Sequence, residues 1–331
     1  YKHSIINIKF IIFLSRNIMS TYHNYFSQNK LSINEVIDLY EINRSIFPKP
    51  SRMGKLKVAN SISEISEKFD AFIFDSYGVL NTGSLLIKNV KDVLIKLKEK
   101  GKIIIVLTNG ASYPTSNKVS LFNNWCLPFE NEEVISSRDL LKDYLKNQDQ
   151  IKWGVIGSPR SDLNELGVNG HILGESISKL NECEGIIYLG CEYWDQNKQI
   201  KLEHKFQNTS MQILVGNPDI VAPQKSSFSI EPGFWGLNFH KSKNFDIKYF
   251  GKPHLDIFEK AIQNIFKISQ RKFNLDRIAM IGDSLHTDVL GGLASGISTV
   301  LVTSHGLFKN HDYQKEILRT QIYPDWIIPS I

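Results

Sequence analysis

The segment "FIFDSYGVLNTG", Phe72–Gly83, runs from a short apolar stretch into a carboxylate, Asp75, and then into a glycine-bearing turn. A short apolar run bounded by a turn is consistent with a buried β-strand, so we expect a strand over 71–74. In open parallel α/β sheets, ligands bind beyond the carboxyl ends of the strands. The segment therefore predicts a strand that presents Asp75 to a ligand site, with the phenol of Tyr77 two positions further along.

Helices and strands alternate on both sides of this segment. Helical periodicity over 86–100 leads into "KIIIVLTNG" at 102–110, so this part has the length of a parallel βαβ unit. The C-terminal part also alternates between helix and strand, over 255–269, 277–284, 286–296 and 298–306. Both parts together predict an α/β fold with one doubly wound parallel sheet.

The region between these two parts contains further strand-like runs, "WGVIG", "GIIYLG" and "MQILVG". Polar or helical segments separate them, which predicts a second α/β unit inserted into the first. We place the core domain at 51–116 and 249–331, and the inserted cap domain at 117–248.

Residues 1–50 are predicted to be an N-terminal extension. Within it, "LSINEVIDLYEINRSIF" predicts a helix over about 33–46, with a serine and a glutamate at capping-box spacing. The earlier stretch "IINIKFIIFL" is interrupted by a lysine and is shorter than the ~20 apolar residues that span a bilayer. We therefore expect no stable membrane insertion, with a weak membrane-surface or signal-like segment as the alternative. Met19 is a candidate start, in which case 1–18 are not native.

Composition places the chain among ordinary globular proteins. Of its 331 residues, 42% are hydrophobic and 22% are charged, and the net charge is +5. No basic stripe accompanies this mild charge, so we expect no nucleic-acid partner, whereas an anionic substrate is compatible with it. Cys126, Cys183 and Cys191 form no CxxC pair, which favours buried thiols in a reducing compartment, the cytoplasm.

Polar groups follow the predicted core elements at Asp75, Thr108, Asn109, Lys252 and Asp283, and Asp288 comes early in the next helix. Carboxylates that converge on one point repel one another and need a cation. Hard oxygen ligands select Mg²⁺, which also bridges to substrate phosphate. Because carboxylates are known nucleophiles in phosphoryl transfer, this set predicts a phosphate site with an aspartyl-phosphate intermediate.

Four segments in this order, "FDSYGVLNTG", "LTNGAS", "GKPH" and "GDSLHTDVLGG", resemble motifs I to IV of the haloacid-dehalogenase superfamily. The resemblance covers about 70–331 and is specifically to class IIA, the NagD-like phosphatases. The insert resembles the class IIA cap domain, in which "GNPDIVAP" is similar to a segment of that class. The resemblance implies a hydrolase of phosphoric monoesters that uses Mg²⁺ and acts on a small phosphorylated metabolite, such as a sugar phosphate.

The resemblance also implies roles for single residues. Asp75 would be the nucleophile and a metal ligand, together with Asp283 and the backbone carbonyl of Tyr77. Lys252 would neutralise the phosphoryl group. The remaining implied phosphate-site residues are Thr108, Asn109, Ser284 and Asp288, with Asp288 orienting the site through water.

Simpler interpretations stay open for several of these residues. Thr108 and Asn109 are also ordinary turn residues, Lys252 could be a surface lysine, and Asp288 suits the start of any helix. Asn217 and Asp219 are equally compatible with a turn and with a substrate contact. The lone histidines and the large aromatic residues of the insert are expected to be structural: His254, His286, Trp194, Phe234 and Trp235.

Tyr77 departs from the family pattern. The usual residue there is a second aspartate, which protonates the leaving group and then activates water. Tyrosine, with a reference pKa near ~10, is a poor base at neutral pH. The resemblance includes a subgroup with an aromatic residue at this position, so Tyr77 does not by itself imply loss of activity. We expect slow turnover of alkyl phosphates unless the substrate or a water supplies the acid.

Two classes of function remain open from the sequence. The first is the Mg²⁺-dependent phosphatase, and the second is a catalytically weak or inactive phospho-ligand-binding or regulatory protein on the same fold. A dinucleotide-binding oxidoreductase is a distant third, because the first strand lacks GxGxxG. A homo-oligomer is possible in either case.

Overall fold

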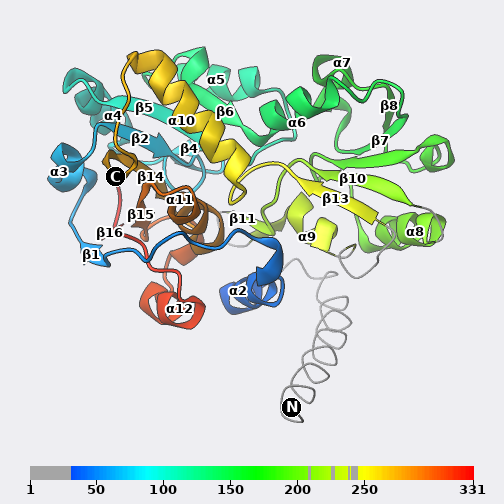
Figure 1. The fold of residues 1–331 in the computed structure, drawn as a ribbon. Coiled ribbons are helices and arrows are strands. Elements are labelled where there is room, and N and C mark those ends of the chain that lie inside the picture. Colours follow the sequence, from blue (N-terminus) through cyan, green and yellow to red (C-terminus); the bar gives the residue numbers. More distant parts are fainter. Residues whose placement is uncertain (1–30, 208–209, 225–227, 238, 240–244) are drawn as a thin grey trace, which may run out of the picture.

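The computed structural model describes residues 31–331 apart from 208–209, 225–227, 238 and 240–244. The expectations for 1–18 therefore lie outside the described residues. Two parallel sheets stand side by side, each flanked by helices (Figure 1). The predicted α/β class, with a doubly wound parallel sheet and an inserted second unit, is confirmed.

The larger sheet has seven parallel strands. In spatial order they are β1 (Lys57–Val58), β16 (Trp326–Ile328), β15 (Ser298–Val302), β14 (Ile278–Gly282), β2 (Ala71–Phe74), β5 (Ile103–Thr108) and β6 (Val134–Ser136). From β2 the chain proceeds through β5 to β6 at one edge, and from β14 through β15 to β16 on the other side. The order therefore reverses between β2 and β14, which is where such sheets bind ligands.

Alternate side chains of β2 enter two different apolar layers, because successive residues of a strand point to opposite faces. Phe72 and Phe74 pack with α4 (Val90–Glu99) and α5 (Thr115–Asn124) on one face. Ala71 and Ile73 pack with α10 (Leu255–Ser269) on the other face. All four β2 side chains are fully buried, so the strand is held from both faces and Asp75 leaves it at a defined point.

The smaller sheet has five parallel strands, in the order β13 (Phe245–Tyr249), β10 (Met211–Val215), β9 (Gly185–Tyr188), β7 (Trp153–Ile156) and β8 (Gly170–Ile172). The predicted start of the insert at residue 117 needs correction. Strand β6, at 134–136, pairs with β5 in the larger sheet, and the five-stranded sheet begins only at Trp153. The "VIS" of β6 is too short to stand out as a strand in the sequence.

The remaining elements surround these two sheets. The short two-stranded sheets pair β3 (Asn81–Thr82) with β4 (Leu85–Leu86), and β11 (Val221–Pro223) with β12 (Phe228–Ile230). The other helices are α2 (Ile33–Ile42), α3 (Ile62–Ile65), α6 (Ser137–Leu145), α7 (Leu163–Leu166), α8 (Gln196–Phe206), α9 (Pro232–Leu237), α11 (Leu290–Ala294) and α12 (Tyr313–Thr320).

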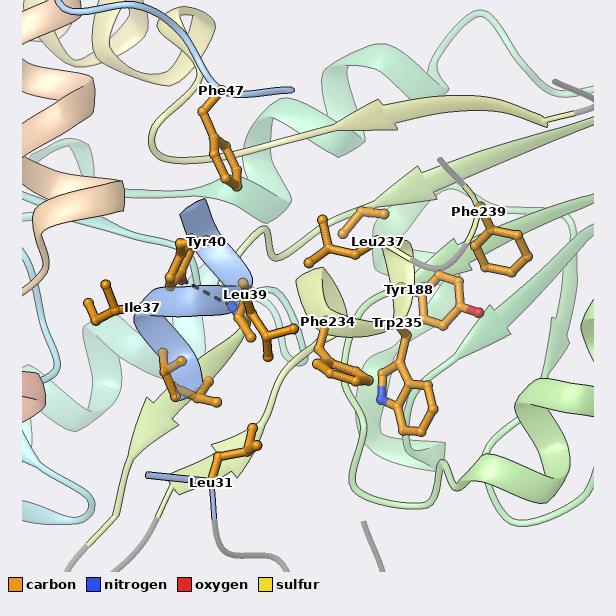
Figure 2. Close-up of a cluster of buried hydrophobic side chains, with 14 of the residues drawn as sticks. Leu31, Ile37, Leu39, Tyr40, Phe47, Tyr188, Phe234, Trp235, Leu237 and Phe239 are labelled. Carbon is orange, nitrogen blue, oxygen red and sulfur yellow. Dashed lines mark hydrogen bonds between the residues drawn. The ribbon is translucent and has the colours of Figure 1, made fainter. Parts of the chain in front are cut away.

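Helix α2 lies at the junction of the two sheets and packs against both units (Figures 1 and 2). Its predicted capping box is present, since Ser32 and Glu35 bind each other's backbone N–H groups. Tyr40 stacks on His286 of the core with ring centroids 4.6 Å apart, and its hydroxyl accepts the N–H of Ile220 from the insert at 3.1 Å. The N-terminal extension therefore joins core and insert.

Buried aromatic side chains of the insert form core rather than a binding surface, as expected. Phe234 and Trp235 lie in the same apolar cluster as α2 (Figure 2), and Trp194 is also buried. Of the cysteines, Cys183 is buried but Cys126 is exposed, so the expectation of buried thiols is wrong for Cys126. Among the described residues, no helix has the length and hydrophobicity needed to cross a membrane.

If α2 is an integral part of the fold, truncating its buried face should destabilise the protein. Ile37 is fully buried at the junction, so Ile37→Ala should reduce the free energy of unfolding by about 2–5 kcal/mol. Asn34→Ala, on the exposed face of the same helix, should change it by less than about 0.5 kcal/mol. Denaturant titration of both variants measures the difference, and equal stabilities would show that α2 is dispensable.

Candidate active site

Two carboxylates leave the sheet on either side of its reversal point. Asp75 follows β2, and Asp283 follows the neighbouring strand β14. The backbone N–H of Asp75 donates to the carbonyl of Ile281 at 2.9 Å, which continues the pairing to the site. Oxygens of Asp75, Asp283 and Asp288 all lie within 4.8 Å of one another, so the predicted cluster forms.

Glycine backbones allow the loops to approach Asp283 closely. Gly78 has φ +75°, and a Cβ there would lie 2.4 Å from Asp283 Oδ2. Gly306 has φ +70°, and its Cβ would meet the same carboxylate. In addition, the N–H of Leu307 donates to Asp283 Oδ2 at 2.7 Å. The carboxylate is therefore enclosed by backbone that only glycine can supply without strain.

The side chain of Lys252 contacts two of these carboxylates. Its Nζ lies 2.7 Å from Asp75 Oδ1 and 2.7 Å from Asp288 Oδ1, and the residue is 1% exposed. Burial alone would lower the pKa of Lys252, but the nearby carboxylates, Asp288 first, outweigh it and raise the pKa above its usual value. The lysine is therefore a permanent buried cation beside Asp75, not the surface residue of the simpler interpretation.

Asp288 lies in a π-helical turn, Leu285–Val289, directly before α11. Its Oδ1 accepts from Lys252, and its Oδ2 accepts the N–H of Ser284 at 3.1 Å. We expected Asp288 to act through water, but here it binds Lys252 directly. Its carboxylate therefore positions the lysine, besides lying within reach of the other two acids.

Asn109 connects the end of β5 to the Lys252 loop. Its Oδ1 accepts the N–H of Lys252 at 2.7 Å, and its Nδ2 donates to the carbonyl of Lys252 at 2.9 Å. The same Nδ2 donates to Asp219 Oδ1 of the insert at 2.8 Å. Asn109 is thus committed to holding the site together, while the hydroxyl of Thr108 beside it accepts the N–H of Gly110 at 3.2 Å.

The site opens into a cavity of about 320 Å³ between the core and the insert. This volume is at the lower end of the range for small-molecule pockets, so it suits a small metabolite rather than a macromolecule. Six of the predicted site residues line it: Asp75, Tyr77, Thr108, Asn109, Asp283 and Ser284. The other two, Lys252 and Asp288, do not line the cavity, and Lys252 contacts both Asp75 and Asp288.

Tyr77 faces this cavity and keeps its proton firmly. The pKa of Tyr77 is raised above its usual value, mainly by burial and to a smaller extent by the nearby carboxylate of Glu231. Lys118 Nζ lies 5.4 Å from the centroid of its ring. A phenol in this environment is even less ionised at neutral pH than free tyrosine, which agrees with the expectation that Tyr77 is a poor base.

Three cavity residues were missed or undervalued in the sequence: Lys118, Asp219 and Glu231. Lys118 follows motif II on α5, where we had assigned the insert. At Asp219 the sequence is equally compatible with a turn and with a substrate contact, and nothing local singles out Glu231. The two histidines have structural surroundings, because His286 contacts Tyr40 and Glu41 and His254 stacks on Tyr249.

The acids suit a hard divalent cation. The pKa of Asp283 is raised well above its usual range, mainly by burial and also by repulsion from the carboxylates of Asp75 and Asp288. Three carboxylates with one lysine leave excess negative charge in a buried place, which a cation would compensate. Carboxylate and carbonyl oxygens are the ligands that Mg²⁺ prefers, so the donor set fits the expected ion.

Comparison with known proteins agrees with this geometry. Residues 72–169 match the haloacid dehalogenase-like hydrolase family, and residues 249–331 match the HAD-hydrolase-like family. A 4-nitrophenylphosphatase of Schizosaccharomyces pombe is 25% identical, covering 84% of this chain and 97% of its own length. The ribonucleotide monophosphatase NagD of Escherichia coli K12 is also 25% identical, and the match covers 78% of this chain and 95% of the length of NagD.

A solved structure with the same fold is that of a possible sugar phosphatase of the HAD superfamily from Cytophaga hutchinsonii. It has a TM-score of 0.70 and 24% identity, covering 84% of this chain and 98% of that chain. The two family matches span more than half of the sequence and include the segments that carry Asp75, Thr108, Lys252 and Asp283. The chain belongs to the haloacid dehalogenase-like hydrolases.

Proposed function

We propose that the protein is a Mg²⁺-dependent phosphatase that hydrolyses a small phosphorylated metabolite through an aspartyl-phosphate on Asp75. One observation carries the proposal: the Asp75 carboxylate lies 2.7 Å from the buried ammonium of Lys252 and within reach of Asp283, on the wall of a cavity between the core and the insert. A nucleophile, a permanent cation and a metal-binding carboxylate then meet at one point.

In this mechanism Asp75 attacks the phosphorus atom of the substrate. Lys252 and the N–H of Ser76 both bind Asp75 Oδ1, which holds the carboxylate in one orientation. Lys252 also balances the negative charge of the incoming phosphoryl group. Thr108, which lines the cavity, would bind a phosphoryl oxygen through its hydroxyl.

Asp75, Asp283 and the backbone carbonyl of Tyr77 would hold the metal ion. Bound Mg²⁺ supplies a fixed positive charge that offsets the charge on the phosphate oxygens. The carbonyl role needs no particular side chain at position 77, so the tyrosine leaves it intact.

The substrate class follows from the cavity and the relatives. A space of about 320 Å³ suits a phosphate group with a small organic part. Relatives named as a nitrophenyl phosphatase, a nucleotide phosphatase and acid sugar phosphatases support the same range, and a sugar phosphate-like molecule is the substrate we propose.

One observation favours a second candidate, a protein that binds a phosphorylated ligand without efficient turnover. The phenol of Tyr77 occupies the motif I position of the usual acid and base, and its raised pKa removes it as a base. Steady hydrolysis in the presence of Mg²⁺ would exclude this candidate.

Asp75→Asn should abolish hydrolysis of all phosphate monoesters, because the amide cannot form the phosphoenzyme. The measurement is phosphate release from a panel of phosphorylated metabolites with Mg²⁺. Asp70→Asn is the matched control, since Asp70 precedes the opposite end of the same strand and pairs with Arg277. It should keep full turnover. Activity in Asp75→Asn would show that another group attacks phosphorus.

Asp283→Asn should remove Mg²⁺-dependent turnover while the protein stays folded, because the variant keeps the side-chain shape but loses one anionic ligand. Activity across a Mg²⁺ titration, with circular dichroism as the check on folding, measures this. Excess chelator should also stop the native enzyme. Unchanged activity with chelator would contradict the metal assignment.

A further inference from the structure

The core motifs leave one chemical role unfilled. An alkyl phosphate needs a proton on its leaving oxygen, and the attacking water must later lose one. Tyr77 cannot serve as the base, as its raised pKa indicates. Efficient hydrolysis of alkyl phosphates therefore needs another acid and base in the cavity.

Two further carboxylates line the cavity, Asp219 and Glu231, and their surroundings differ. Both oxygens of Glu231 are engaged, Oε1 by the hydroxyl of Ser229 at 2.7 Å and Oε2 by Asn217 Nδ2 at 3.2 Å. Among the described residues, the side chain of Asp219 has a hydrogen bond only through Oδ1, from Asn109. Asp219 therefore retains an oxygen for a ligand.

Asp219 is fixed to the phosphate site by a single residue. Asn109 Nδ2 donates both to Asp219 Oδ1 at 2.8 Å and to the backbone carbonyl of Lys252 at 2.9 Å. Lys252 Nζ in turn contacts Asp75. One amide thus holds the insert carboxylate next to the Lys252 backbone, where Asp219 interacts electrostatically with both Lys252 and Asp75.

Further hydrogen bonds fix the backbone of the loop that carries Asp219. The N–H of Asp219 donates to Asn217 Oδ1 at 2.9 Å, and Asn217 is bound to Glu231. The next residue, Ile220, donates its N–H to the hydroxyl of Tyr40 on α2 at 3.1 Å. Both residues belong to the apolar cluster that α2 forms with the insert (Figure 2). These hydrogen bonds fix the position of the Asp219 loop, as a residue that transfers protons to a bound substrate requires.

We propose that Asp219 is the general acid and base of this enzyme, in place of the motif I aspartate that Tyr77 replaces. The proposal rests on the phosphatase function proposed above. It assigns a catalytic residue to the inserted unit, whereas the nucleophile and the lysine belong to the core.

As the bond between Asp75 and phosphorus forms, the bond between phosphorus and the leaving oxygen breaks, and the Asp219 proton moves to that oxygen to give an alcohol. In the second step the Asp219 carboxylate takes a proton from water while the water oxygen attacks phosphorus. The bond to Asp75 then breaks, inorganic phosphate leaves, and Asp219 is again protonated.

The electrostatic surroundings suit both forms of the group. Burial away from water is the main cause that raises the pKa of Asp219 to about 7. The ammonium of Lys252 lowers this pKa, whereas the carboxylates of Asp75 and Glu231 raise it further. Among the described residues, the charged and titratable groups that interact with Asp219 are Lys252, Asp75, Asp288, Glu231 and the phenol of Tyr40. The acid form is present below this pKa, so hydrolysis of alkyl phosphates should fall as the pH rises through about 7.

The test compares native protein with Asp219→Asn on 4-nitrophenyl phosphate, phenyl phosphate and glycerol phosphate, with Mg²⁺. We expect kcat/KM for glycerol phosphate to fall by ~10²–10⁴-fold, the usual value of acid–base catalysis. Nitrophenolate needs no proton to leave, so the variant should release one equivalent in a burst and then turn over slowly. The fall in alkyl phosphate hydrolysis above pH 7 should be present only in the native protein.

Two further variants separate catalysis from structure. Tyr77→Asp should restore alkyl phosphate hydrolysis in the Asp219→Asn background, because it returns a carboxylate to the motif I position. Asp246→Asn, which changes an exposed carboxylate on strand β13 of the insert, should behave as native.

The outcomes are distinguishable. Equal losses on all three substrates without a burst, or no loss at all, would overturn the role of Asp219 while leaving the phosphatase function in place. Absence of rescue by Tyr77→Asp would also count against it. A native protein that hydrolyses none of the substrates would overturn the proposed function, and this inference with it.

Discussion

The buried ammonium of Lys252 is the constraint on which the site depends. It lies between Asp75 and Asp288, which come from segments far apart in the sequence, and it follows the inserted unit directly. Removing one member of such a buried group typically costs about 3–5 kcal/mol, because the remaining charge is left unpaired. The ion pairs therefore bring the chain before the insert and the chain after it to the same point.

The position of the insert follows from this same point. Asn109 binds both backbone polar groups of Lys252 and also the Asp219 carboxylate, so the loop that fixes the lysine also fixes the insert. On the other side of the junction, Tyr40 stacks on His286 of the core and binds Ile220 of the insert. Polar and apolar contacts thus hold the two units in one arrangement around the cavity.

The sequence was informative where one local pattern decides the outcome. Fully buried parallel strands are short apolar runs, so β2 could be predicted with its residues, and their polar ends located Asp75 and Asp283. Three-residue β6 has no such pattern, which displaced the predicted boundary of the insert. The contact between Asn109 and Asp219 joins residues 110 positions apart, and no periodicity reports such a distance. Likewise, the amphipathic pattern of α2 predicts a buried face but does not identify the two units that cover it.

Tyr77 shows how a backbone role and a side-chain role can separate at one position. The carbonyl at position 77 depends only on the path of the chain after β2, which Gly78 and the contact with Asp283 maintain. The side chain is free to change if another carboxylate reaches the leaving oxygen. A catalytic carboxylate on the insert would make the placement of that unit part of the chemistry, since the core alone could hold metal and phosphate but lacks a base that activates the attacking water. The contacts of Asn109 and Tyr40 across the junction would then serve catalysis as well as stability.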